Sequence, residues 1–187
     1  TTLDTFENYH FTTQFKWGEK KWAPRLNRKR DSGILYHCSG EHGEFWEVWK
    51  RSLEYQVQES DLGDFIGLSG PKGLIRVEKA GGKKFRYAPN SEEKQLTSDY
   101  TDASEDPERP HGEWNTLEVY TIGQTAIHVA NGVVVMVVEE TQDASGAPLT
   151  SGQIQIQSEA AECYYKNMQI TPITEFPSEI TAQIPFL

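Results

Sequence analysis

The sequence predicts an all-β fold, a sandwich or a barrel of antiparallel strands. Polar and apolar residues alternate with a period of two in several short segments, which is the pattern of a strand with one buried face. Turn residues separate these segments, and no segment shows the apolar period of a convincing amphipathic helix. The chain has 187 residues, a common size for one domain, so we expect a single domain over residues 1–187.

Eight segments are predicted as strands. In the clearest of them, Leu53, Tyr55 and Val57 alternate with polar residues. The others, in chain order, are 6–15, 32–38, 118–121, 126–130, 133–138, 153–158 and 163–170. Asn131-Gly132 joins two of these segments and is a strong hairpin signal, because both central residues of a type I′ turn need a positive φ. The polar segments 90–110 and 142–152 are predicted as surface loops.

The charge of the chain argues against two classes of partner. With 18 basic and 28 acidic residues the net charge is −10, and an acidic surface repels nucleic acid and anionic membranes. No apolar stretch approaches the roughly 18 residues that span a bilayer. Cys38 and Cys163 lack metal-site spacing and are interpreted as small buried hydrophobes, with a disulfide as the open alternative.

The first residues give an expectation about localisation. The chain begins with Thr-Thr-Leu rather than Met, which favours a processed or trimmed chain. We therefore expect a periplasmic or extracellular protein, membrane-anchored if the removed N-terminal segment was an anchor. We also expect that the chain lacks a natural first strand. Nothing in the sequence indicates the oligomeric state.

Two rows of polar side chains are the first candidates for function. The rows are Glu54, Gln56 and Gln58 on one strand, and Gln155, Gln157 and Glu159 on another. Carboxylates and amides bond sugar hydroxyls in pairs, so these rows on neighbouring strands predict the polar floor of a saccharide site. Glu54 and Glu159 could divide acid and base work between them. The alternative is two ordinary solvated strand faces.

Two strand histidines are further candidates. A histidine near a carboxylate can act as a base or a metal ligand at neutral pH, whereas a single strand histidine is otherwise a structural residue. We expect His128 to take part in catalysis, and His37 and its neighbour Tyr36 to bind substrate. Trp46 and Trp49 are expected to stack on a sugar ring, with core packing as the alternative.

An acidic turn follows the strand that carries Glu54. Its carboxylates, Glu59, Asp61 and Asp64, could hold a divalent metal ion such as Ca²⁺ through oxygen ligands. The spacing does not fit an EF-hand loop, so a plain acidic turn at the strand end is the alternative. The sequence contains no phosphate-binding loop, dinucleotide fingerprint or nucleophile elbow, and we expect no nucleotide cofactor.

Five ordered motifs resemble those of one family. They are Asp31-Ser-Gly-Ile-Leu-Tyr-His-Cys38, Leu53-Glu-Tyr-Gln-Val-Gln-Glu-Ser-Asp-Leu-Gly-Asp64, Gly112-Glu-Trp-Asn-Thr-Leu-Glu118, His128-Val-Ala-Asn-Gly132 and Gln157-Ser-Glu-Ala-Ala-Glu-Cys-Tyr-Tyr-Lys-Asn167. The family is the 3-keto-disaccharide hydrolase-like domain, and the resemblance spans about residues 6–171. The chain departs from its pattern at Asp31, where the family has Asn, at Ser60 and Ala160, where it has Gly, and at Lys166, where it has Arg.

The resemblance implies a concanavalin A-like jelly roll of two antiparallel sheets with a concave sugar-binding face. Members are mostly bacterial, often exported, and act on glycosides already oxidised to a 3-keto sugar. A ketone at C3 acidifies the proton on C2, so a modest base removes it and the aglycone leaves from C1. Something must polarise the ketone, and a metal ion could do so.

We therefore expect a glycoside hydrolase or lyase that acts on 3-keto glycosides or disaccharides. The expected catalytic residues are Glu54, His128 and Glu159. The expected substrate-binding residues are Gln56, Gln58, Gln157, His37, Tyr36, Trp46 and Trp49. A non-catalytic carbohydrate-binding module on the same fold is the alternative, because a fold does not fix a function.

Overall fold

Strands make up most of the computed structural model, which describes residues 1–82 and 84–187. In chain order they are β1 (Phe6–Glu7), β2 (Tyr9–Lys21), β3 (Asp31–Ser39), β4 (Arg51–Gln58), β5 (Phe65–Leu68), β6 (Lys72–Gly81), β7 (Lys84–Tyr87), β8 (Lys94–Thr97), β9 (Thr101–Asp102), β10 (Asn115–Ile122), β11 (Thr125–Ala130), β12 (Val133–Gln142), β13 (Ser151–Glu159) and β14 (Ala161–Pro172). One helical turn, α1 (Ser178–Thr181), follows near the C-terminus.

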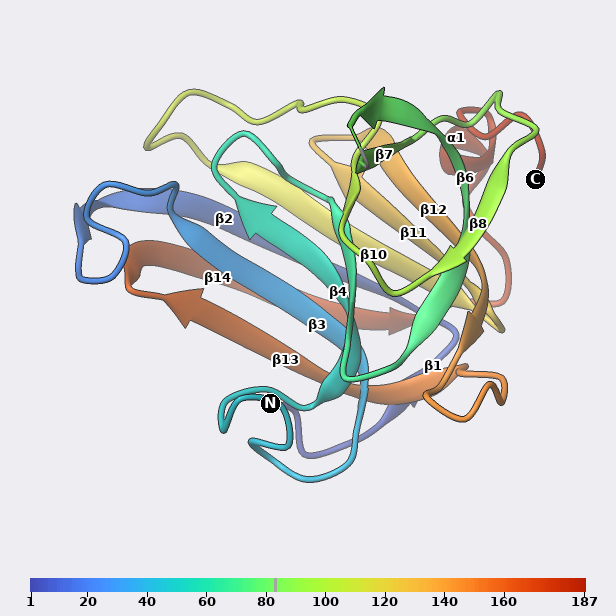
Figure 1. Ribbon diagram of the computed structural model, residues 1–187, viewed down its shortest axis with the longest axis horizontal. Coiled ribbons are helices and arrows are strands. Elements are labelled where there is room, and N and C mark those ends of the chain that lie inside the picture. Colours follow the sequence, from blue (N-terminus) through green and yellow to red (C-terminus); the bar gives the residue numbers. More distant parts are fainter. Residues whose placement is uncertain (83) are drawn as a thin grey trace.

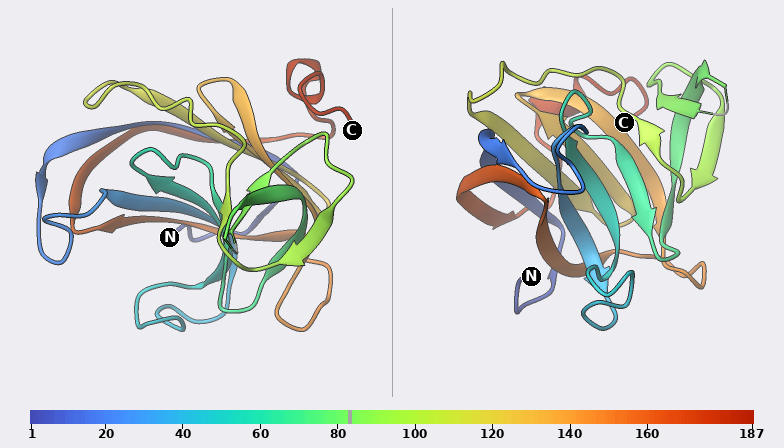
Figure 2. Two further views of the ribbon diagram at one scale, coloured as in Figure 1. Left: turned by 45° about the horizontal axis from the view of Figure 1, so that its top comes forward. Right: turned by 60° about the vertical axis from the view of Figure 1, so that its left-hand side comes forward.

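The strands form a continuous hydrogen-bonded path that folds back on itself into two layers (Figure 1). One layer runs through β13, β3, β4 and β5, and the other through β12, β11, β10, β2 and β14. Strands β9, β7 and β6 connect them, since β6 pairs with β12, and β8 pairs with β6 outside the path. Turned views show the two layers facing each other across the interior (Figure 2).

Alternate side chains of both layers fill the space between them. Ile34 of β3 and Tyr55 of β4 are fully buried from one layer, and Phe15 of β2 and Val119 of β10 from the other. Burying an apolar side chain of this size contributes about 1.5–3 kcal/mol relative to exposure. The period of two in the sequence is therefore the physical cause of the layered fold.

The prediction of an all-β protein is confirmed, and all eight predicted strands are present. The Asn131-Gly132 hairpin is confirmed too, with φ of 51° and 84° at its two central residues. Two details differ. Segment 90–110, predicted as a loop, contains β8 and β9, and the strands form one path continuous through β6 and β12 rather than two separate sheets. Cys38 is buried, and both cysteines are free thiols.

Apolar residues near the C-terminus complete the core. Ile180 of α1 and Ile184 are buried, and Gln183 accepts a hydrogen bond from the Val134 backbone and donates one to the Gly132 carbonyl. These contacts hold the segment against the hairpin of β11 and β12. Within residues 1–82 and 84–187, no helix is long and apolar enough to cross a membrane.

Candidate functional site

The strand register brings the two predicted polar rows onto one outward surface. Its cross-strand sets, taken from β13 through β3 to β4, are Gln155, Leu35 and Glu54, then Gln157, Gly33 and Gln56, then Glu159, Asp31 and Gln58. Successive side chains of a strand point to opposite faces, so these nine positions lie opposite the core. We call this surface the polar face.

Glu54 lies on the β4 side of the polar face, next to Gly33, and is almost completely covered. Only 2% of the residue is exposed. Its Oε1 atom accepts a hydrogen bond of 2.8 Å from the Gln157 amide nitrogen. This contact crosses over Gly33, where a Cβ would overlap with Glu54 Oε1 and lie 2.7 Å from Gln157 Nε2. The absence of a side chain at position 33 therefore makes room for the Glu54–Gln157 pair.

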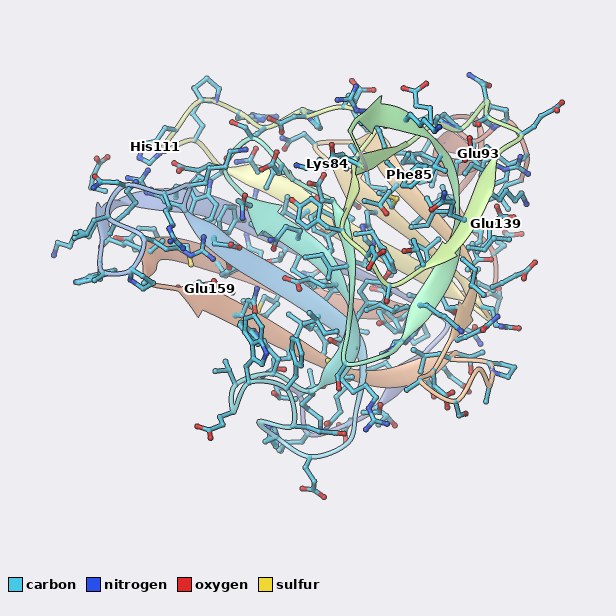
Figure 3. All side chains as sticks on the ribbon, viewed as in Figure 1. Lys84, Phe85, Glu93, His111, Glu139 and Glu159 are labelled. Atoms are coloured by element: carbon cyan, nitrogen blue, oxygen red, sulfur yellow. The ribbon has the colours of Figure 1, made fainter. Side chains whose placement is uncertain are left out.

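Two further carboxylates lie beside this pair and share one arginine. Arg25, from the loop before β3, forms ion pairs with Asp31 at 2.5 Å and with Glu159. Glu159 is the last residue of β13, and Figure 3 shows it at the strand end beside the loop 22–30. The site thus combines two carboxyl groups that share one arginine with a third, buried carboxyl group, that of Glu54.

Burial sets the protonation state of this cluster. It raises the pKa of Glu54 well above the usual range of a glutamate, and the negative charges of Asp31 and Glu159 raise it further. Burial likewise raises the pKa of Asp31 to about 6, opposed by Arg25 and by the hydrogen bond from Gln58. Burial therefore favours the protonated form of Glu54, which is the form that can donate a proton.

Three acceptor oxygens of the polar face are buried without a protein partner. Among the described residues nothing donates to Asp31 Oδ1, Gln56 Oε1 or Gln157 Oε1. Asp31 is 4% exposed and Gln56 is 5% exposed. A buried acceptor without a donor costs about 1–3 kcal/mol. The polar face therefore holds three buried acceptor oxygens that the described residues leave without a donor.

Two glutamines earlier in β13, Gln153 and Gln155, hold a neighbouring loop. Gln155 accepts a hydrogen bond from the Lys50 backbone, and Gln153 accepts one from the Lys50 ammonium group. The loop 40–50, which carries Trp46 and Trp49, is thereby fixed beside the polar face. Trp46 is 75% exposed, so it is not a core residue.

The prediction that His128 is catalytic is wrong, because the structure gives it a structural role. It lies between the two layers and is fully buried, with Nδ1 2.8 Å from the Gly63 carbonyl and Nε2 2.9 Å from the Tyr36 hydroxyl. Burial lowers its pKa to about 4, so the ring is neutral. Both ring nitrogens form hydrogen bonds on the core side of β11, so the ring cannot reach the polar face.

Tyr36 and His37 also lie outside the candidate site. Tyr36 is fully buried and bonds to His128, and His37 is 1% exposed with its ring against Tyr9 of the opposite layer. Burial lowers the pKa of His37 to about 4. A register shift in β3 near these positions, together with a φ of 52° at His37, turns the ring inward against the strand alternation. The prediction that these two residues bind substrate is therefore corrected.

The acidic turn does not fit a metal ion. Glu59 forms an ion pair with Arg30, and Asp61 forms one with Lys29. Asp64 accepts a hydrogen bond of 2.6 Å from the Ala103 backbone, and burial raises its pKa to about 7. Across residues 1–82 and 84–187, no three His, Cys, Asp or Glu side chains are grouped to hold a metal. The predicted Ca²⁺ site at these three residues is corrected accordingly.

Sequence reasoning missed Arg25, Gly33 and Asp31 as members of the site. Asp31 and Gly33 belong to a recognised motif, and their place opposite the polar rows could have indicated them. Arg25 precedes β3 in a loop without a motif. Its contact with Glu159 joins residues that are 134 positions apart, which no local pattern reveals.

A hollow of about 470 Å³ opens at the β13 edge of the polar face. Gln157 lines it together with Trp22, Glu162 and Tyr165. Trp22 is 51% exposed. Gln157, which donates a hydrogen bond to Glu54, therefore lies at an open edge of the site.

Comparisons with known proteins agree with this architecture. The family model described as the 3-keto-alpha-glucoside-1,2-lyase-like domain matches residues 1–171. Two candidate glycosyl hydrolases from Parabacteroides distasonis have similar solved structures, each with 17% identity, TM-scores of 0.54 and 0.56, and coverage of 92% of this chain and 81% and 75% of theirs. The carbohydrate-binding module CBM66 from Bacillus subtilis aligns at 8% identity and a TM-score of 0.53, over 90% of this chain and 77% of its own. These likenesses show the fold, and no curated protein sequence matches the chain.

Proposed function

Because the chain belongs to the 3-keto-alpha-glucoside-1,2-lyase-like domain family, we propose that its polar face cleaves the glycosidic bond of a glycoside with a ketone at C3. The observation that carries the proposal is the arrangement around Gly33. A buried carboxyl group, an amide that touches it, and three unpartnered acceptor oxygens converge there. Acceptors in this number suit a ligand whose many hydroxyl groups donate hydrogen bonds.

The chemistry needs one base, one acid and a group that polarises the ketone. A base removes the proton on C2, the electron pair forms the C1–C2 double bond, and the C1–O bond to the aglycone breaks. The leaving oxygen takes a proton from the acid. Water can then add across the double bond, so that the overall result is hydrolysis. No covalent bond between sugar and protein is required.

The three roles are assigned from charge and burial. Glu54, whose burial favours the protonated form, protonates the leaving oxygen. Glu159, paired with Arg25 and 27% exposed at its side chain, takes the proton from C2. The Arg25 guanidinium group has further N–H donors and polarises the ketone oxygen. A substrate that displaces the Gln157 amide gains contact with the Glu54 carboxyl group.

Steady-state turnover of a 3-keto disaccharide tests the proposal. The Glu54→Gln substitution keeps the size of the side chain and removes the transferable proton, so kcat should fall by roughly 100- to 10,000-fold. Glu175→Gln, at an exposed glutamate after β14, is the matched control and should retain wild-type turnover. Equal turnover by wild type and Glu54→Gln would contradict the proposal.

A carbohydrate-binding module without catalysis is the second candidate. The exposed Trp46 of the loop 40–50 favours it, because an aromatic ring can stack on a sugar without any chemistry. In that case wild type binds glycosides and leaves them intact. Glu54→Gln would then change only the dissociation constant, which separates the two candidates.

A further inference from the structure

The tip of the loop 40–50 has a strained backbone that places a tryptophan in solvent. Val48 donates a backbone hydrogen bond of 3.1 Å to Phe45, which closes a four-residue turn. The two central residues, Trp46 and Glu47, have φ of 51° and 62°. A turn of this kind favours Asn and Gly, whereas a bulky side chain is strained in it. Strain of this type persists where surrounding structure enforces it and clusters at functional positions.

Three aromatic rings form a continuous surface at this tip. Trp46 stacks on Phe45 with ring centres 5.1 Å apart and an angle of 19°, and it lies 5.9 Å from Trp49. Trp46 is 75% exposed. The Nε1–H group of Trp49 is buried and has no acceptor among the described residues. We call these three side chains the aromatic tip.

Hydrogen bonds from the polar face hold the loop in place. Gln155 binds both ends of its last turn, since it accepts from the Lys50 backbone at 3.1 Å and donates to the Val48 carbonyl at 3.4 Å. Gln155 and Gln157 are two residues apart on β13, a spacing of about 7 Å along the strand. The end of the loop, at the bottom of Figure 1, is therefore held by Gln155, which lies two strand positions from Gln157 of the Glu54–Gln157 pair.

We infer that the aromatic tip binds the second ring of the glycoside, a pyranose on the leaving side of the bond that is cut. The inference rests on the proposed function and names the part of the substrate that this function leaves unspecified. The C–H face of a pyranose is apolar and stacks on an indole ring, while its hydroxyl groups reach neighbouring polar atoms. The Trp49 N–H group supplies a donor for one of those hydroxyl oxygens.

Calorimetric titration of the Glu54→Gln variant tests the inference, because this variant should bind the substrate and cleave it at least about 100-fold more slowly than wild type. The two ligands are a 3-keto disaccharide and the corresponding methyl 3-ketoglycoside, which lacks the second ring. Adding Trp46→Ala should weaken disaccharide binding roughly tenfold and leave the methyl glycoside unchanged. Trp46→Phe keeps a stacking ring and should retain most of the affinity. Tyr164→Ala, at a 45% exposed aromatic residue of β14, is the control and should change neither affinity.

The outcomes separate this inference from the proposed function. If Trp46→Ala binds the disaccharide as tightly as its parent while wild type still cleaves it, only the role of the aromatic tip is overturned. An equal loss of affinity for both ligands also overturns it, since the tip would then not recognise the second ring. If wild type binds the disaccharide and never cleaves it, and Trp46→Ala weakens that binding alone, the inference stands and the proposed catalysis fails.

Discussion

The carboxyl group of Glu54 depends on a residue that has no side chain. Gly33 leaves space between the Glu54 carboxyl and the Gln157 amide, and both atoms would be too close to a methyl group there. The backbone of Gly33 is ordinary strand, so only this close approach demands glycine. A small residue at position 33 is therefore a condition for the buried hydrogen bond that positions Glu54, the proposed acid.

We predict that Gly33→Ala damages activity more than stability. The new methyl group pushes the ends of two side chains apart, an overpacking that costs roughly 1–3 kcal/mol of unfolding free energy. Turnover should fall by more than tenfold, because the acid loses its position. Denaturant unfolding and steady-state kinetics measure the two effects. Adding Gln157→Ala removes one of the colliding groups, so Gly33→Ala should cost less stability in that background; an equal cost contradicts this account.

The protonation of Asp64 links stability to pH. Burial raises its pKa from 3.8 to about 7, with smaller contributions from the charges of Asp61 and Asp102. The folded protein therefore binds a proton there that the unfolded chain releases. Its stabilising contribution is complete below pH 3.8 and is lost as the pH rises to about 7. The pKa values of His37 and His128 are lowered, so these residues change the unfolding free energy with pH in the opposite direction. The effect of Asp64 is therefore measured as the difference in unfolding free energy between wild type and a variant at position 64.

We predict that Asp64→Asn gains stability relative to wild type as the pH rises. Asparagine accepts the Ala103 hydrogen bond and does not titrate. Between pH 4 and pH 7 the difference in unfolding free energy should move in favour of the variant by about 3 kcal/mol, from a pKa shift of this size. Urea unfolding of both proteins at pH 4, 5.5 and 7 measures it. Parallel pH profiles would show that Asp64 ionises normally in the folded protein.

Asn131 connects a hairpin to the long loop that precedes β10. Its Oδ1 atom accepts from the Thr116 backbone at 2.9 Å, and its amide donates to the Pro107 carbonyl and to Asn115 Oδ1. Its positive φ closes the turn between β11 and β12. One side chain thus fixes both the turn and the position of a surface segment from a distant part of the chain.

We predict that Asn131→Ala destabilises the protein by about 2–4 kcal/mol, since it loses three hydrogen bonds and strains the turn. Asn131→Gly keeps the positive φ and loses only the hydrogen bonds, so it should be less destabilised than the alanine variant. Thermal and urea unfolding give both values. Turnover at low temperature should stay near wild type, because Asn131 lies away from the polar face. Equal stability of the two variants would mean that the turn conformation contributes nothing.

Elements with a clear period of two could be predicted from the sequence. The alternation around Glu54 and around Gln157 gave both strands and the side that carries their polar residues. Apart from the Asn131-Gly132 hairpin, strand pairing was not predictable, because register depends on contacts between distant segments. For the same reason the sequence did not indicate Arg25 as a site residue. It also led to the wrong prediction that His128 belongs to the site, although its strand lies in the opposite layer. The bulge that turns His37 inward breaks the alternation on which its prediction rested.

At the scale of the whole molecule, the two-layer fold separates stability from function. Apolar side chains between the layers hold the molecule together, while the outward side of β13, β3 and β4 is left for polar side chains. The fold is shared with candidate glycosyl hydrolases and with a carbohydrate-binding module, so the fold alone does not decide between cleavage and binding. That decision depends on whether the carboxyl groups of the polar face transfer protons.

Proton NMR of a 3-keto α-glucoside in D₂O tests this claim most directly, since it follows the C2 proton and the released aglycone together. Wild type should replace the C2 proton with deuterium and release the aglycone. Glu54→Gln should still exchange the C2 proton but release the aglycone at least 100-fold more slowly, because the base remains and the acid is gone. Glu159→Gln should lose both reactions. Release of the aglycone by Glu54→Gln at the wild-type rate would contradict the account.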